Sequence, residues 1–150
     1  VFTKENNYDG FIDPEQFEWL KQELETTPST QPVLVTSHIP LFSPSPMVYG
    51  FDAKDSTWKV SGSSVTKNFN EVKKLFDTRP NVKLCISGHI HLVDRYDYNG
   101  VSYLCNGAVC GAWWLGRNKD FDPGYVVIDL YPDGTFKNEF VKWGWKAGSG

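Results

Sequence analysis

The most informative stretch of this chain is CISGHIH, residues 85–91, in which an apolar strand runs into two histidines. Residues 82–86 form an apolar run that predicts a buried strand, and Gly88 ends it. Residues two apart at a strand end lie on the same side of the backbone, so both imidazoles can converge on one point. Neutral imidazole is the commonest protein ligand for metals. The stretch therefore predicts that His89 and His91 bind metal.

The third of the three histidines in the chain, His38, also follows a predicted strand, residues 33–37. Open α/β sheets bind ligands at the carboxyl ends of their strands, so all three histidines lie where such folds place their chemistry. We therefore expect His38 to join His89 and His91 as a metal ligand. The alternative for any single histidine is a hydrogen-bonded core or surface residue without a metal.

Composition restricts the class of protein. The 150 residues suit one domain, and a hydrophobic content of 40% is enough to build a core. A net charge of −3 offers no electrostatic basis for bulk nucleic-acid binding, although it permits a phosphodiester held by metal. No run is long enough to predict a membrane span. Three cysteines favour buried, reduced thiols over a disulfide framework, which leaves the cellular compartment open.

Local signals place the other elements in the order helix, strand, helix, strand and hairpins. A helix is predicted after Asp13, a typical N-cap, and helical spacing of apolar residues predicts a second helix over 64–78. Asn-Gly at 99–100 predicts a hairpin turn before a strand at 101–105, and alternation predicts a terminal β-hairpin over 124–143. This order predicts an α/β fold in which a mixed sheet is flanked by helices.

Residues 41–63 are predicted to be irregular, because prolines and glycines interrupt a segment rich in aromatic side chains. A long loop directly after a candidate ligand is often functional, and we interpret it as a substrate-facing lid. The alternative is a structural loop that packs on its own aromatic side chains. The sequence leaves both open.

Three motifs give the chain a resemblance to a known family. Ser-His-Ile-Pro at 37–40 and Gly-His-Ile-His at 88–91 each follow an apolar strand, and the strand at 101–105 runs into Asn-Gly at 106–107. In this arrangement the chain resembles the C-terminal half of the calcineurin-like metallophosphoesterases over most of its length. The resemblance implies half of an α-β-β-α sandwich, to which residues 1–150 would contribute mainly one of the two sheets.

The motifs of the family's first half, D-x-H, G-D-x-x-D and G-N-H-E/D, do not occur in this sequence. The resemblance implies that they supply the bridging aspartate, the remaining ligands and the general-acid histidine. Val1 reads as an internal junction, so the missing half is expected to be cleaved away, to form a separate chain or to be absent. By itself this chain is expected to bind metal weakly and to hydrolyse phosphate esters slowly or not at all.

The resemblance also implies the cofactor and the reaction. Two divalent or trivalent ions of manganese, iron or zinc would be held, one by His38 and His89 and the other by His91. A mixture of imidazole and carboxylate ligands leaves the identity of the metal open. A metal-activated hydroxide would attack a phosphate mono- or diester in line. Purple acid phosphatases would use the same histidines with a tyrosine ligand from the absent half, and the sequence does not separate the two groups.

Further residues are candidates for substrate binding. Asn106 begins a small-residue loop whose amides can approach a phosphate, although a tight turn explains it equally well. Trp58 and Trp113 are candidates for stacking on an aromatic or sugar leaving group, with core packing as the alternative. Asp94 and Asp97 match no ligand of the family, and we expect them on a solvated turn.

The sequence leaves two hypotheses open. The first is a metal-dependent phosphoesterase whose partners are a phosphate-ester substrate and either the missing N-terminal half or a second copy of the chain. The second is a non-catalytic binding or assembly domain that keeps vestigial histidines. Convergence of the three histidines favours the first hypothesis, whereas imidazoles that point apart favour the second.

Overall fold

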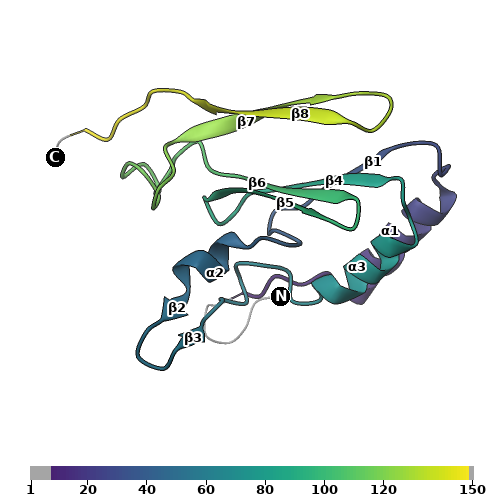
Figure 1. Cartoon of the computed structure of the whole chain (residues 1–150), viewed down its shortest axis with the longest axis horizontal. Helices are drawn as coiled ribbons and strands as arrows, with labels where there is room; N and C mark the ends of the chain where they lie inside the picture. Colours follow the sequence, from purple (N-terminus) through teal and green to yellow (C-terminus); the bar gives the residue numbers. More distant parts are fainter. Residues whose placement is uncertain (1–7, 149–150) are drawn as a thin grey trace.

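The computed structural model describes residues 8–148 of the chain. Its elements follow in the order α1 (Pro14–Thr26), β1 (Val33–Thr36), α2 (Ser45–Tyr49), β2 (Phe51–Asp52), β3 (Thr57–Trp58), α3 (Phe69–Asp77), β4 (Val82–Ser87), β5 (Val93–Tyr98), β6 (Val101–Asn106), β7 (Gly124–Leu130) and β8 (Phe136–Lys142). Figure 1 shows three layers, in which the β7–β8 hairpin and the helices α1 and α3 lie on opposite sides of a central sheet. The predicted α/β class is therefore confirmed.

The central sheet has four strands in the order β1-β4-β6-β5. Strands β1, β4 and β6 are parallel, and β5 runs antiparallel to β6, so the sheet is mixed as predicted. Asn99 and Gly100 both have positive φ, 49° and 79°, as the predicted two-residue turn between β5 and β6 requires. Because β1 and β4 are parallel neighbours, the segments that follow them leave the sheet at the same edge.

Helices α1 and α3 cover one face of this sheet. The Asp13 side chain accepts a hydrogen bond of 2.8 Å from the Gln16 amide, which confirms the predicted N-cap of α1. The apolar residues of the two helices and of the sheet form one core: Leu20, Leu24, Leu41, Val72, Phe76, Val82, Cys85, Val101 and Tyr103. None of the helices between residues 8 and 148 is long and apolar enough to cross a membrane.

The second helix is shorter than predicted, because α3 begins at Phe69 and not at residue 64. Two backbone amides just before it are bonded elsewhere: Thr66 N–H donates to the Pro40 carbonyl at 2.9 Å and Lys67 N–H to the Gly10 carbonyl at 2.7 Å. These bonds hold the segment against Gly10 and Pro40, so it does not take up the helical pattern that its apolar spacing predicts.

The β7–β8 hairpin forms a second layer over the other face of the sheet (Figure 1). The Phe140 ring packs so close to Gly124 that a Cβ there would lie 2.3 Å from it. Across the layers, the Arg95 guanidinium lies 5.0 Å from the centre of the Phe136 ring. The chain therefore contributes mainly one four-stranded sheet, and the predicted terminal hairpin adds a two-stranded second layer.

Residues 41–63 are more ordered than predicted, because they contain α2 and the short β2–β3 hairpin. The expected placement of Asp94 and Asp97 on a solvated turn was also wrong, since both lie on β5. Asp94 accepts hydrogen bonds from Ser43 Oγ at 2.5 Å and from the Ser45 amide at 3.3 Å. Strand β5 therefore anchors the start of the 41–63 segment.

Candidate functional site

The structure brings the histidines together at the carboxyl edge of the sheet. His38 follows β1, while His89 and His91 follow β4. His38 Nε2 and His89 Nδ1 are 3.0 Å apart, and the centres of the two rings are 4.7 Å apart. Burial lowers the pKa of His89, and the neighbouring His38 and His91 lower it further. The cluster therefore favours the neutral imidazole of His89, which is the form that binds metals.

Backbone hydrogen bonds continue past the end of β1 and align the two histidine-bearing segments. The Ser37 amide donates to the Ile86 carbonyl at 2.9 Å, and the Gly88 amide donates to the His38 carbonyl at 3.2 Å. His89 and His91 both have left-handed φ, 64° and 57°. Such conformations are unfavourable for residues with a side chain and occur preferentially at functional sites.

His91 is oriented by the loop between β6 and β7. Its Nδ1 donates a hydrogen bond of 2.6 Å to the Gly111 carbonyl, which leaves Nε2 as the lone-pair nitrogen. Metal-binding histidines commonly have their other ring nitrogen fixed in this way. Gly111 has φ 54°, and a Cβ on it would lie 2.2 Å from the Gly116 carbonyl oxygen, so the position requires glycine.

Strand β6 supports the turn that carries the two histidines. The Cys105 thiol donates to the Gly88 carbonyl at 3.2 Å, and Ser87 Oγ donates to the Leu104 carbonyl at 3.0 Å. Burial raises the pKa of the Cys105 thiol to about 12, so the thiol keeps its proton and remains a donor. The turn is therefore held from behind by buried groups.

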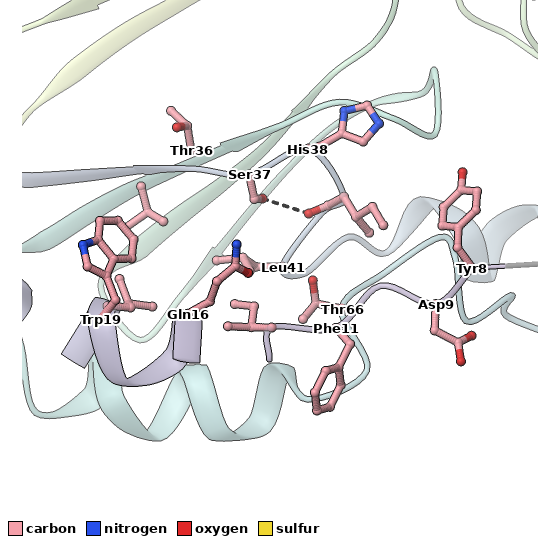
Figure 2. A pocket seen from close by; sticks show the side chains of 14 residues that line it. Tyr8, Asp9, Phe11, Gln16, Trp19, Thr36, Ser37, His38, Leu41 and Thr66 are labelled. Atoms are coloured by element: carbon pink, nitrogen blue, oxygen red, sulfur yellow. Dashed lines mark hydrogen bonds between the residues drawn. The ribbon is translucent and has the colours of Figure 1, made fainter. Parts of the chain in front are cut away.

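Tyr8 is a neighbour of the cluster that sequence reasoning missed. Its hydroxyl lies 2.9 Å from His89 Nε2, although the two residues are 81 positions apart. Tyr8 and His38 also line a cavity of about 600 Å³ beside α1 and β1. Figure 2 shows these two residues toward one end of the cavity, and Trp19 and Gln16 toward the other. No local motif predicts this contact, because it joins two residues that are far apart in the sequence.

A second cavity of about 380 Å³ opens directly at His89. Tyr49, Lys59 and Trp113 line it with His89, and the Trp113 ring lies 4.6 Å from the His91 ring, centre to centre, at an angle of 34°. Among the predicted substrate-binding residues, the structure therefore brings Trp113 to the histidines.

The other two predicted substrate-binding residues, Trp58 and Asn106, differ in their placement. Trp58 is on β3, does not line this cavity, and its ring packs at 5.0 Å against that of Phe51. Asn106 ends β6, where it pairs in register with Val93. Asn106 thus lies one residue past the Ser87–Cys105 pair, at the sheet edge that also carries His89, whereas Trp58 packs within the β2–β3 hairpin.

The loop that carries Trp113 also carries Trp114, which packs against two tryptophans that follow β8. The Trp114 ring packs edge-on against the rings of Trp143 and Trp145, with ring centres 6.2 and 5.4 Å apart. The Trp143 indole also donates a hydrogen bond of 2.9 Å to the Val109 carbonyl. The segment after β8 thus holds the loop between β6 and β7 in place.

The histidines fit part of a metal shell. With metal–nitrogen bonds of about 2.0–2.1 Å, two neighbouring ligand nitrogens lie roughly 3 Å apart, which matches the separation of His38 Nε2 and His89 Nδ1. Asp94 is bonded to Ser43 and Asp97 to Arg95, so these carboxylates are engaged outside the cluster. Across residues 8–148, no group of three or more histidine, cysteine, aspartate or glutamate side chains is arranged to hold one ion.

Comparison with known proteins identifies the family of the chain and two of its relatives. The chain is 27% identical over 138 residues to a 3′,5′-cyclic-nucleotide phosphodiesterase of Nostoc sp., covering 89% of this chain and 47% of the relative. It is also 27% identical over 134 residues to the 3′,5′-cyclic adenosine monophosphate phosphodiesterase CpdA of Escherichia coli, covering 87% and 44%. The chain thus spans about half the length of the curated relatives it matches. A sequence model described as calcineurin-like phosphoesterase matches residues 2–93, more than half of the chain, which therefore belongs to that family.

Proposed function

We propose that this chain supplies His38, His89 and His91 as metal ligands to a phosphoesterase site that is completed by residues outside these 150. The observation that supports the proposal most directly is the 3.0 Å separation of His38 Nε2 and His89 Nδ1. These atoms come from residues 51 positions apart, and two adjacent parallel strands bring them together. The alternative of vestigial histidines predicts rings that point apart, which is not the arrangement of this pair.

The substrate of the completed site is a phosphate ester, and a phosphodiester is the first one to test. Family membership favours phosphoester hydrolysis in general. The two relatives are named as cyclic-nucleotide phosphodiesterases, so a cyclic nucleotide is the natural first diester and a phosphomonoester the natural comparison.

The chain's own residues would prepare the site in two ways. Bound metal ions would supply a nucleophilic hydroxide near neutral pH and neutralise charge that develops on the phosphate. His38 and His89 would hold one ion, and His91 would present Nε2 to the other because its Nδ1 is bonded to the Gly111 carbonyl. The lowered pKa of His89 keeps its ring neutral, so a proton does not compete with the ion at ordinary pH.

The most suitable place for the completing residues is the open edge of β1. This strand pairs only with β4 among the described strands, and its Leu34 is 36% exposed. Trp19 and Phe11 line the cavity beside this edge and are 60% and 45% exposed. Contact of such large apolar side chains with water is unfavourable in free energy. We infer that the N-terminal half, or a second copy of the chain, covers this edge and brings the carboxylate ligands.

The proposal is tested on the longer protein that contains this chain, with the isolated chain measured in parallel. We expect the longer protein to bind two metal ions and to hydrolyse a cyclic nucleotide only with metal, whereas the isolated chain binds metal weakly. Native mass spectrometry reads the bound metal and any partner chain together. His38→Gln and His89→Gln should abolish metal binding and hydrolysis, and the exposed Glu139→Gln on β8 should change neither. Full activity in both histidine variants would refute the assignment.

A further inference from the structure

We propose that the cavity between Tyr49 and Trp113 is a subsite for a planar aromatic ring of the substrate, of the size and chemistry of a nucleobase. The inference rests on the proposed function in one respect, since His89 lines the same cavity and would hold the metal beside it. A substrate whose phosphate lies at the histidines would then place its ring against Trp113.

The shape and lining of the cavity carry the first step. Its volume of about 380 Å³ exceeds what one nucleobase occupies, and aromatic side chains line it from three separate segments, with Tyr8 beside His89. Tyr49 comes from α2, and Trp113 comes from the loop between β6 and β7. Trp113 is 68% exposed although it packs one side against His91, so much of its ring is available for stacking.

The second step is that both aromatic side chains are already fixed in place. Trp113 has a left-handed φ of 49°, and hydrogen bonds from the Trp114 amide to the Cys110 carbonyl and from the Ala112 amide to the Gly116 carbonyl hold that turn. The Tyr49 hydroxyl donates to Asp120 at 2.7 Å, which joins the two segments. Preorganised aromatic surfaces lose little conformational freedom when a ring stacks on them.

The third step concerns charge, which decides whether the cavity favours a neutral ring or a second phosphate group. Lys59 is a cation of the cavity wall, but its ammonium is paired with Asp52 at 2.7 Å and with Asp55 at 3.2 Å. The charge of Lys59 is therefore balanced within its own hairpin and does not attract a further anion. The aromatic walls favour a neutral planar group, and stacking on them tolerates any base.

The test uses the full 150-residue chain with adenosine and ribose as probes, because neither carries a phosphate that would report on the metal site. In NMR titrations, adenosine should shift the ring resonances of Trp113 and Tyr49, whereas ribose should not. Trp113→Ala should weaken adenosine binding about tenfold, and Trp113→Phe, which keeps a ring, by less than about threefold. Trp19→Ala, which removes an indole of similar 60% exposure from α1, is the matched control and should leave binding unchanged.

The subsite would be overturned by the absence of adenosine binding up to its solubility limit, or by an adenosine affinity that Trp113→Ala leaves unchanged. Shifts of equal size with ribose would do the same. Adenosine binding without metal-dependent hydrolysis in the longer protein would support the subsite and contradict the proposed function. Hydrolysis of a diester that has no aromatic ring, together with absent adenosine binding, would support the function and reject the subsite.

Discussion

The histidine wall of the site (His38, His89 and His91) and its aromatic wall (Tyr49 and Trp113) are held by different parts of the fold. The histidines follow adjacent parallel strands and are supported from behind by buried groups of β6. The aromatic side chains lie on connecting segments and are exposed by 38% and 68%. Under the proposed function, the sheet would fix the metal ligands, while the connecting segments would adapt the site to a particular substrate.

The most damaging change to the histidine wall is His89→Ala, because His89 contacts both His38 and Tyr8. Substitution of outer-shell partners of a metal ligand costs about 10–100-fold in affinity, so loss of the ligand itself should cost more than about 100-fold in metal binding and hydrolysis. Isothermal titration with manganese or zinc measures the first effect. Thermal unfolding in the absence of metal is the control, since His89 is only partly buried and its loss should alter stability little.

Gly111→Ala changes the loop residue whose carbonyl orients His91 of the histidine wall. The new Cβ would lie 2.2 Å from the Gly116 carbonyl and would require a left-handed φ, so we expect a loss of about 1–3 kcal/mol in the free energy of unfolding. Displacement of the carbonyl that orients His91 should also lower metal affinity about 10–100-fold. Gly148→Ala, where a Cβ meets nothing within 4 Å, is the matched control. Unchanged metal affinity in Gly111→Ala would show that this loop does not contribute to metal binding by the histidine wall.

Cysteine alkylation compares the rigidity of the sheet with that of the loops. Burial raises the pKa of Cys85 and of Cys105 to about 12, from an ordinary value of 9.0, so both stay protonated up to about pH 9 in the folded chain. Cys110 lies on the partly exposed loop between β6 and β7. Iodoacetamide should label Cys110 at least about tenfold faster than the other two, as read by peptide mass spectrometry. Equal labelling of all three would show that the sheet opens readily.

Tyr49→Phe is the mildest change, since it keeps the ring of the aromatic wall and removes only its bond to Asp120. An exposed hydrogen bond of this kind contributes at most about 1 kcal/mol. We expect a KM that rises about two- to fivefold for a substrate with an aromatic ring, with kcat unchanged. A substrate without such a ring should show no difference, and a change in kcat of similar size for both substrates would place Tyr49 in the chemistry.

Features of the fold that depend on neighbouring residues were predictable from the sequence. The Asp13 cap of α1 and the Asn99–Gly100 turn each need only a few consecutive residues, and both agree with the structure. The start of α3 was not predictable, because the amides of Thr66 and Lys67 bond to carbonyls of distant segments. The order within residues 41–63 was missed for a similar reason, as Asp94 on β5 fixes the beginning of that segment.

In the candidate site, too, some features were predictable from the sequence and others were not. The positions of the histidines after apolar strands were readable, since parallel strands bring their carboxyl ends to one edge. The contacts of Tyr8 with His89 and of Gly111 with His91 join residues 81 and 20 positions apart, and no spacing rule encodes them. The left-handed turn at Trp113 and Trp114 sends one ring to His91 and the other to Trp143, a division that depends on backbone conformation and distant partners.

The packing of Trp114, Trp143 and Trp145 also has an optical consequence. The rings of Trp143 and Trp145 are stacked with their centres 6.3 Å apart, and that of Trp114 stands nearly perpendicular to both. Indole chromophores held at fixed mutual angles contribute to near-ultraviolet circular dichroism, and that signal disappears when specific packing is lost. The chain therefore carries a built-in spectroscopic reporter of the loop that bears Trp113, readable in solution without any label.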